Sequence, residues 1–105
     1  MHVDDLLRIA VESGASDLHL KVGSLPMMRV RGDLVPAVPD LRLTHEHLVA
    51  MSDAVMQPQH HNRFNEVRDG DLAVSIPGLG RFRCNVCQQR GTVGLVFRVI
   101  PMKIP

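Results

Sequence analysis

The chain has 105 residues, which is enough for one domain and too few for two. Its formal net charge of +1 argues against a broad nucleic-acid interface, because such an interface needs a strongly basic face. Hydrophobic residues make up 45% of the chain but form no run of the roughly 20 residues that span a membrane, so an ordinary globular domain is expected.

The first third of the chain predicts one helix and then three short strands. Apolar residues recur at helical spacing over residues 3–13, and Gly14 is a suitable left-handed cap for the end of that helix. Apolar and polar residues then alternate with the two-residue period of half-buried strands. These strands are expected at residues 16–22, 28–31 and 34–35. Pro36 and Pro39 follow, and they bring the strand pairing to an end because proline has no N–H to donate.

The middle of the chain predicts two helices. Thr44 is a good N-cap for the first of them, and Glu46 in its first turn suits the positive end of the helix dipole. Four apolar residues recur at helical spacing on the face that is expected to be buried. They are Leu48, Met51, Ala54 and Val55. Pro58 fits the first turn of a second, shorter helix over residues 58–67.

The last third of the chain predicts three more strands. They are expected at residues 71–76, 81–88 and 93–100. A turn rich in glycine and proline at residues 77–80 separates the first two of them. The element order is therefore αβββααβββ, and the fold class is α+β. One domain is expected over residues 1–100, and residues 101–105 are expected to begin a linker.

Positive charge gathers near the end of the chain. Four arginines fall within residues 81–98, and no acidic residue follows Asp71. Arg90 and Gly91 lie between the last two expected strands, and glycine suits the positive φ of a tight hairpin turn. We therefore expect a basic hairpin that needs an anionic partner.

Two of these arginines, Arg83 and Arg98, are expected to lie directly opposite each other on that hairpin. Like charges in such a pair destabilise a sheet by a few tenths to about 1 kcal/mol, so stability alone does not select them. A phosphate or carboxylate bound between them would turn this destabilisation into stabilisation, because a guanidinium binds such anions with two hydrogen bonds. The alternative is two solvated side chains on an exposed face.

Cysteine and histidine give weaker signals. Cys84 and Cys87 are too few for a disulfide framework, and they favour a reducing, cytosolic setting. Positions i and i+3 of a strand point to opposite faces, so two structural cysteines are expected and no metal site. His19 is expected to form a local hydrogen bond, since no nucleophile that it could activate is identifiable.

Three separated segments of this chain resemble signatures of the twitching-motility (PilT-type) secretion ATPases. The first is GASDLHL at residues 14–20, and the second is PMMRVRGDL at residues 26–34. The third is interrupted, with PGLGRFRCN at residues 77–85, QRG at 89–91 and FRVIP at 97–101. Because the three occur in the family's order and span nearly the whole chain, the resemblance is more specific than any single short motif.

The resemblance implies a fold and a place in a larger machine. The family's N-terminal domain is PAS-like, an antiparallel sheet of about six strands flanked by two or three helices. A C-terminal RecA-like domain carries the phosphate loop, and the subunits form a hexameric ring in the cytoplasm, peripheral to the inner membrane at the pilus base. The implied partners are the RecA-like domains of the same and neighbouring subunits and an inner-membrane platform protein, with no nucleic acid.

The resemblance also implies a role for the two arginines. Arg83 and Arg98 match family arginines that reach the nucleotide held by the RecA-like domain, where they would neutralise charge on the phosphates. ATP and Mg²⁺ are the implied cofactors of the full-length protein, and none is implied for this piece alone. The chain has no GxxxxGK[ST] phosphate loop, so it is not expected to hydrolyse ATP by itself.

Two other interpretations stay open at this point. The chain can belong to a related ATPase that drives pilus extension or type II secretion, because the motifs that distinguish these branches lie in the C-terminal domain. It can also be a free-standing PAS-type module that binds a small ligand within its sheet. Such a module needs convergent polar groups in a pocket, and the sequence offers no convincing inward-facing polar cluster.

Overall fold

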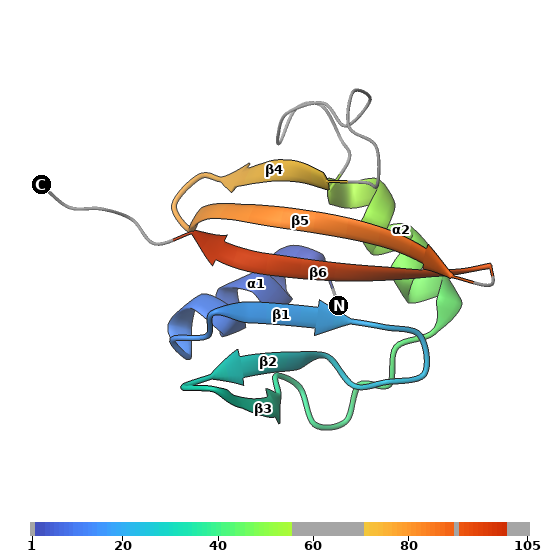
Figure 1. Cartoon of the computed structure of the whole chain (residues 1–105), viewed down its shortest axis with the longest axis horizontal. Helices are drawn as coiled ribbons and strands as arrows, with labels where there is room; N and C mark the ends of the chain where they lie inside the picture. The colour runs from blue at the N-terminus through green and yellow to red at the C-terminus, as the bar shows by residue number, and fades with distance from the viewer. Residues whose placement is uncertain (1, 56–70, 90, 101–105) are drawn as a thin grey trace, which may run out of the picture.

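The computed structural model describes residues 2–55, 71–89 and 91–100, and it folds them into one six-stranded sheet with two helices (Figure 1). In chain order the elements are α1 (Val3–Glu12), β1 (Asp17–Leu20), β2 (Met27–Val30), β3 (Asp33–Pro36), α2 (His45–Val55), β4 (Asp71–Ile76), β5 (Gly80–Gln89) and β6 (Thr92–Ile100). The predicted helix over residues 58–67 and the predicted linker over 101–105 lie outside the described residues. Neither α1 nor α2 is long and apolar enough to cross a membrane.

The sheet is antiparallel in every described pairing, in the order β3-β2-β1-β6-β5-β4. Successive strands pair within β1–β3 and within β4–β6, and these two halves of the sheet meet where β1 pairs with β6. Both helices lie on the same face of the sheet, behind it in Figure 1. The predicted α+β class and six-stranded antiparallel sheet are therefore confirmed.

Helix α1 begins with a capping box and is followed by a left-handed glycine. The His2 imidazole accepts a hydrogen bond from the Asp4 N–H at 3.1 Å, and the Asp5 carboxylate accepts one from the His2 N–H at 3.3 Å. Gly14 has a φ of 75°, as predicted for the residue that follows the helix. The buried stripe of α1 consists of Val3, Leu6, Leu7 and Ala10.

Helix α2 begins at the predicted cap but buries a slightly different stripe. The His47 N–H donates to the Thr44 hydroxyl at 3.1 Å, which satisfies a backbone donor of the first turn. The buried residues are Leu48, Met51, Ser52 and Val55. The prediction that Ala54 is buried was wrong, since Ala54 is only half-buried. Successive helical residues turn by about 100°, which places Ser52 within the stripe and Ala54 at its flank.

The core fills the space between the helices and one face of the sheet. Among its largest fully buried side chains are Phe82 of β5 and Phe97 of β6. Because side chains alternate along a strand, the residues next to these phenylalanines point to the opposite face, which neither α1 nor α2 covers. We call this second face the open face. Its charged residues include Asp17, Arg29, Arg83 and Arg98.

Candidate functional site

The predicted arginine pair lies on the open face, on two neighbouring strands. Strands β5 and β6 pair in the predicted register, with Arg83 directly opposite Arg98. Gly91 lies in the turn that joins the two strands, and its φ of 80° provides the tight reversal that fixes this register. Both arginine side chains are exposed. The predicted juxtaposition of two like charges is therefore confirmed.

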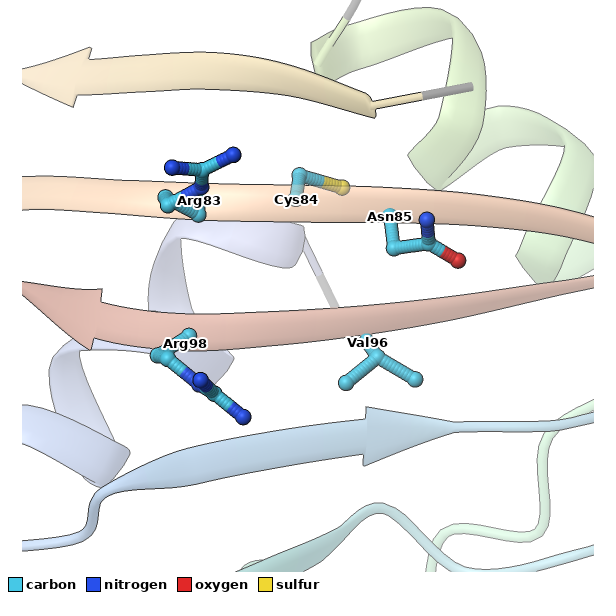
Figure 2. A pocket seen from close by; sticks show the side chains of 5 residues that line it. All are labelled: Arg83, Cys84, Asn85, Val96 and Arg98. Carbon is cyan, nitrogen blue, oxygen red and sulfur yellow. The ribbon is translucent and has the colours of Figure 1, made fainter. Parts of the chain in front are cut away.

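A shallow hollow of about 300 Å³ opens beside these two arginines. It is lined by Arg83, Cys84, Asn85, Val96 and Arg98. Figure 2 shows the guanidinium of Arg83 turned toward β4 and that of Arg98 turned toward β1, as repulsion between like charges favours. Among the described residues neither guanidinium has a hydrogen bond or an ion pair. The hollow is thus flanked by two guanidinium groups that no described residue pairs with.

A second charged cluster adjoins the pair on β1 and β2. The Asp17 carboxylate oxygen Oδ2 lies 3.3 Å from Nε2 of His19 and 3.5 Å from Nε of Arg29. The contact between Asp17 and His19 confirms the local hydrogen bond that was predicted for His19. Sequence reasoning missed the link between Asp17 and Arg29. Strand alternation gives the face on which each residue lies, but it does not say that β1 and β2 bring these two side chains together.

The surroundings of Asp17 hold its carboxyl in the charged form. Burial acts to raise the pKa of Asp17, but hydrogen bonds with Ser16 and His19 and the charges of His19 and Arg29 outweigh burial. The pKa of Asp17 therefore lies below its ordinary value. A carboxyl with a lowered pKa in the folded state stabilises the fold above the pKa of the unfolded chain, and this contribution is lost as the pH falls through the folded-state pKa.

The variant Asp17→Asn tests this contribution. At pH 7 the substitution is expected to lower the free energy of unfolding by about 1 kcal/mol, because it weakens the contacts with His19 and Arg29. The deficit should shrink as the pH falls below about 4, where the carboxyl of the unfolded chain takes up a proton, and it should vanish below the lower pKa of the folded state. Urea unfolding at a series of pH values measures the difference, and a deficit that is independent of pH would contradict the assignment.

Removing either member of the arginine pair is expected to stabilise the chain. Arg83→Gln or Arg98→Gln relieves the repulsion between like charges, so the free energy of unfolding should rise by a few tenths to about 1 kcal/mol. The gain should shrink at high salt, because exposed charges are screened. Urea unfolding at low and high salt measures it, with Arg8→Gln on the exposed side of α1 as the control. A loss of stability in both variants would mean that the arginines support the fold.

The two cysteines lie on opposite faces of β5, as predicted. Cys84 is buried and Cys87 is exposed. The Cys87 thiol donates a hydrogen bond to Oδ1 of Asn85 at 2.8 Å. Within the part of the chain that the structure describes, no three metal-ligating side chains gather into a cluster.

Two curated proteins match the chain along its whole length. The type IV pilus retraction ATPase PilT of Pseudomonas aeruginosa is 38% identical over 104 residues, which cover 99% of this chain and 30% of PilT. The type IV pilus ATPase PilU of the same organism is 38% identical over 105 residues, which cover 100% of this chain and 27% of PilU. The chain thus spans less than a third of either relative. No protein-family model matches the chain.

Solved structures of a pilus motor and of another ATPase share the fold of this chain. A crystal structure of the pilus retraction motor PilT with bound ADP superposes with a TM-score of 0.81 at 34% identity, covering 100% of this chain and 31% of that one. The ATPase DotB of Legionella pneumophila superposes with a TM-score of 0.73 over 98% of this chain and 29% of its own. Its identity is 23%, so that similarity concerns the fold alone.

Proposed function

We propose, on the premise that this chain corresponds to the N-terminal domain of the PilT-type ATPases, that it is the accessory domain of a longer ATPase that powers retraction of type IV pili. The identity to PilT and to PilU is the same, 38%, so the assignment is to this pair of type IV pilus ATPases. The domain does not hydrolyse ATP by itself, since its sequence contains no phosphate loop.

The arginine pair is the observation that carries the assignment to a nucleotide site. Arg83 and Arg98 are exposed and directly opposite each other, an arrangement that costs stability unless an anion lies between them. A guanidinium binds phosphate oxygens with two parallel hydrogen bonds, and the polyphosphate of ATP offers several such oxygens. The related motor PilT was solved with bound ADP, a ligand of this class.

The proposed role of the two arginines is electrostatic. Arg83 and Arg98 approach the phosphates of an ATP molecule that a RecA-like domain holds together with Mg²⁺, and they neutralise charge that develops during phosphoryl transfer. No covalent step is assigned to them. Because ATP presents more phosphate charge than ADP, the contact couples the state of the nucleotide to the angle between the two domains.

The proposed assembly is a hexameric ring. In it the domain contacts the RecA-like domains of its own and neighbouring subunits, and the ring works in the cytoplasm against a platform protein of the inner membrane. The open face is the surface that we assign to the nucleotide-bearing domain, because neither described helix covers it and it carries the arginine pair. Nucleic acid is not assigned as a partner, since the net charge is only +1.

The coding sequence beyond Pro105 tests the assignment to a longer ATPase. A GxxxxGK[ST] motif between an apolar strand and a helix is expected there, because a RecA-like domain needs it to hold the phosphates. The protein from the uninterrupted reading frame should then hydrolyse ATP in a Mg²⁺-dependent reaction. A reading frame without a phosphate loop, or a purified protein without ATP hydrolysis, would contradict the assignment.

A further inference from the structure

Asp17 lies in register with two arginines at once. On β1 it is directly opposite Arg29 of β2 and also directly opposite Arg98 of β6. Because Arg98 is in turn opposite Arg83, four charged residues form one row across β2, β1, β6 and β5. The row carries three arginines and one aspartate. Its single carboxylate can therefore pair with the arginine on either side.

The backbone brings Asp17 close to Arg98. The Val99 N–H donates to the Ser16 carbonyl at 2.9 Å, so the adjacent residues Asp17 and Arg98 form a non-hydrogen-bonded pair. In such pairs the Cα atoms are only about 4.5 Å apart, and the side chains approach more closely than in hydrogen-bonded pairs. Figure 2 also shows the Arg98 guanidinium on the side of β6 that faces β1. An ion pair with Asp17 is within reach, and it would neutralise half of the arginine pair.

The carboxylate of Asp17 is held on the other side instead. Within the described residues it forms an ion pair with Arg29 at 3.5 Å and a hydrogen bond with His19 at 3.3 Å. Arg29 is itself anchored, because its Nη1 donates to the Gly32 carbonyl at 2.9 Å. That carbonyl belongs to the tight turn between β2 and β3, in which Arg31 and Gly32 both have positive φ, 53° and 87°. The position of Arg29 is thus fixed by the turn as well as by Asp17.

We propose that Arg29 is a positioning residue that keeps the Asp17 carboxylate on the β2 side and so leaves Arg98 available to the phosphates, a role that rests on the proposed function. Without Arg29, the carboxylate turns toward Arg98 and competes with the phosphate oxygens for the same donors. Arg29 is assigned no contact with the nucleotide, since its Nε contacts Asp17 and its Nη1 donates to the Gly32 carbonyl. Its effect on the anion passes through Asp17.

The pKa of Asp17, measured by carboxyl ¹³C NMR in the 105-residue chain, reports which arginine the carboxylate contacts. With Arg29 present, Arg98→Gln is expected to leave the pKa nearly unchanged. In the Arg29→Gln background, Arg98→Gln is expected to raise the pKa of Asp17, because the carboxylate then loses its remaining arginine partner. An equal effect of Arg98→Gln in the two backgrounds would overturn the proposal.

Turnover by the longer ATPase tests the consequence for nucleotide use. Arg29→Gln is expected to lower kcat/KM for ATP about fivefold, the order of effect that a part-exposed ion pair can impose. Adding Asp17→Asn to Arg29→Gln should restore the activity, since no carboxylate then competes for Arg98. A merely structural role of Arg29 predicts a further loss in this double variant. Arg8→Gln removes one charge from α1, away from the open face, and should leave kcat/KM unchanged.

The variant Arg98→Gln separates failure of this inference from failure of the proposed function. If Arg98→Gln leaves ATP turnover unchanged, the proposed nucleotide contact is wrong, and the role of Arg29 falls with it. If Arg98→Gln lowers turnover but Arg29→Gln does not, or if Asp17→Asn fails to restore it, only the positioning role is wrong.

Discussion

Replacing Arg98 with alanine is expected to lower ATP hydrolysis by the longer ATPase about a hundredfold, the usual cost of removing one donor that stabilises transition-state charge. The fall should appear mainly in kcat, because the guanidinium acts most strongly on charge that develops during the reaction. Arg83→Ala should have a similar effect. The double variant should lose less than the product of the two, since both arginines act on one anion. Steady-state hydrolysis assays measure all three.

Two controls make this result specific. Arg98→Lys keeps the charge but loses the planar fork, so its activity should lie between that of the native protein and that of Arg98→Ala. Arg8→Ala removes an exposed arginine on α1 and should leave hydrolysis unchanged. Size-exclusion chromatography must show that each variant assembles like the native protein. Assembled Arg83→Ala and Arg98→Ala variants with native turnover would mean that neither residue serves the nucleotide site.

The largest expected effect on stability comes from Phe97→Ala. Phe97 is fully buried on β6, between strands β1 and β5, and it is directly opposite Leu18 and Cys84. Truncating a buried phenylalanine removes its transfer free energy and leaves a cavity, which together cost about 3–5 kcal/mol. Since domains of this kind are stable by only about 5–15 kcal/mol, the variant should be close to unfolding. Urea unfolding followed by circular dichroism measures the loss.

The matched control for Phe97→Ala is Leu34→Ala on β3. Leu34 is 49% exposed and lies on an edge strand, so its truncation should change the free energy of unfolding by no more than about 0.5 kcal/mol. Equal losses in the two variants would mean that the core does not lie between the helices and the β6 strand as described.

The arginine pair could be predicted from the sequence because its geometry is local. A glycine turn between two alternating strands sets both the register and the faces, so Arg83 opposite Arg98 follows from residues near each other in the chain. The same reasoning identified α1, whose apolar spacing and Gly14 cap are local signals. These parts of the fold depend on short-range rules that a single sequence carries.

The charged row across the open face could not be predicted in the same way. It depends on β1 lying between β2 and β6, a pairing of residue 17 with residue 98 across most of the chain. Strand alternation says which face Asp17 occupies, but the order of strands is decided by how the whole core packs. The contact of Asp17 with Arg29 therefore emerged only from the structure.

The most direct test is a structure of the longer ATPase with Mg²⁺ and a non-hydrolysable ATP analogue. The guanidinium nitrogens of Arg83 and Arg98 are expected within about 3 Å of phosphate oxygens of a nucleotide bound to a RecA-like domain. The Asp17 carboxylate is expected to remain on Arg29 in the same structure. Closed subunits in which both arginines face solvent, or pair with carboxylates while the phosphates lie elsewhere, would contradict the central claim.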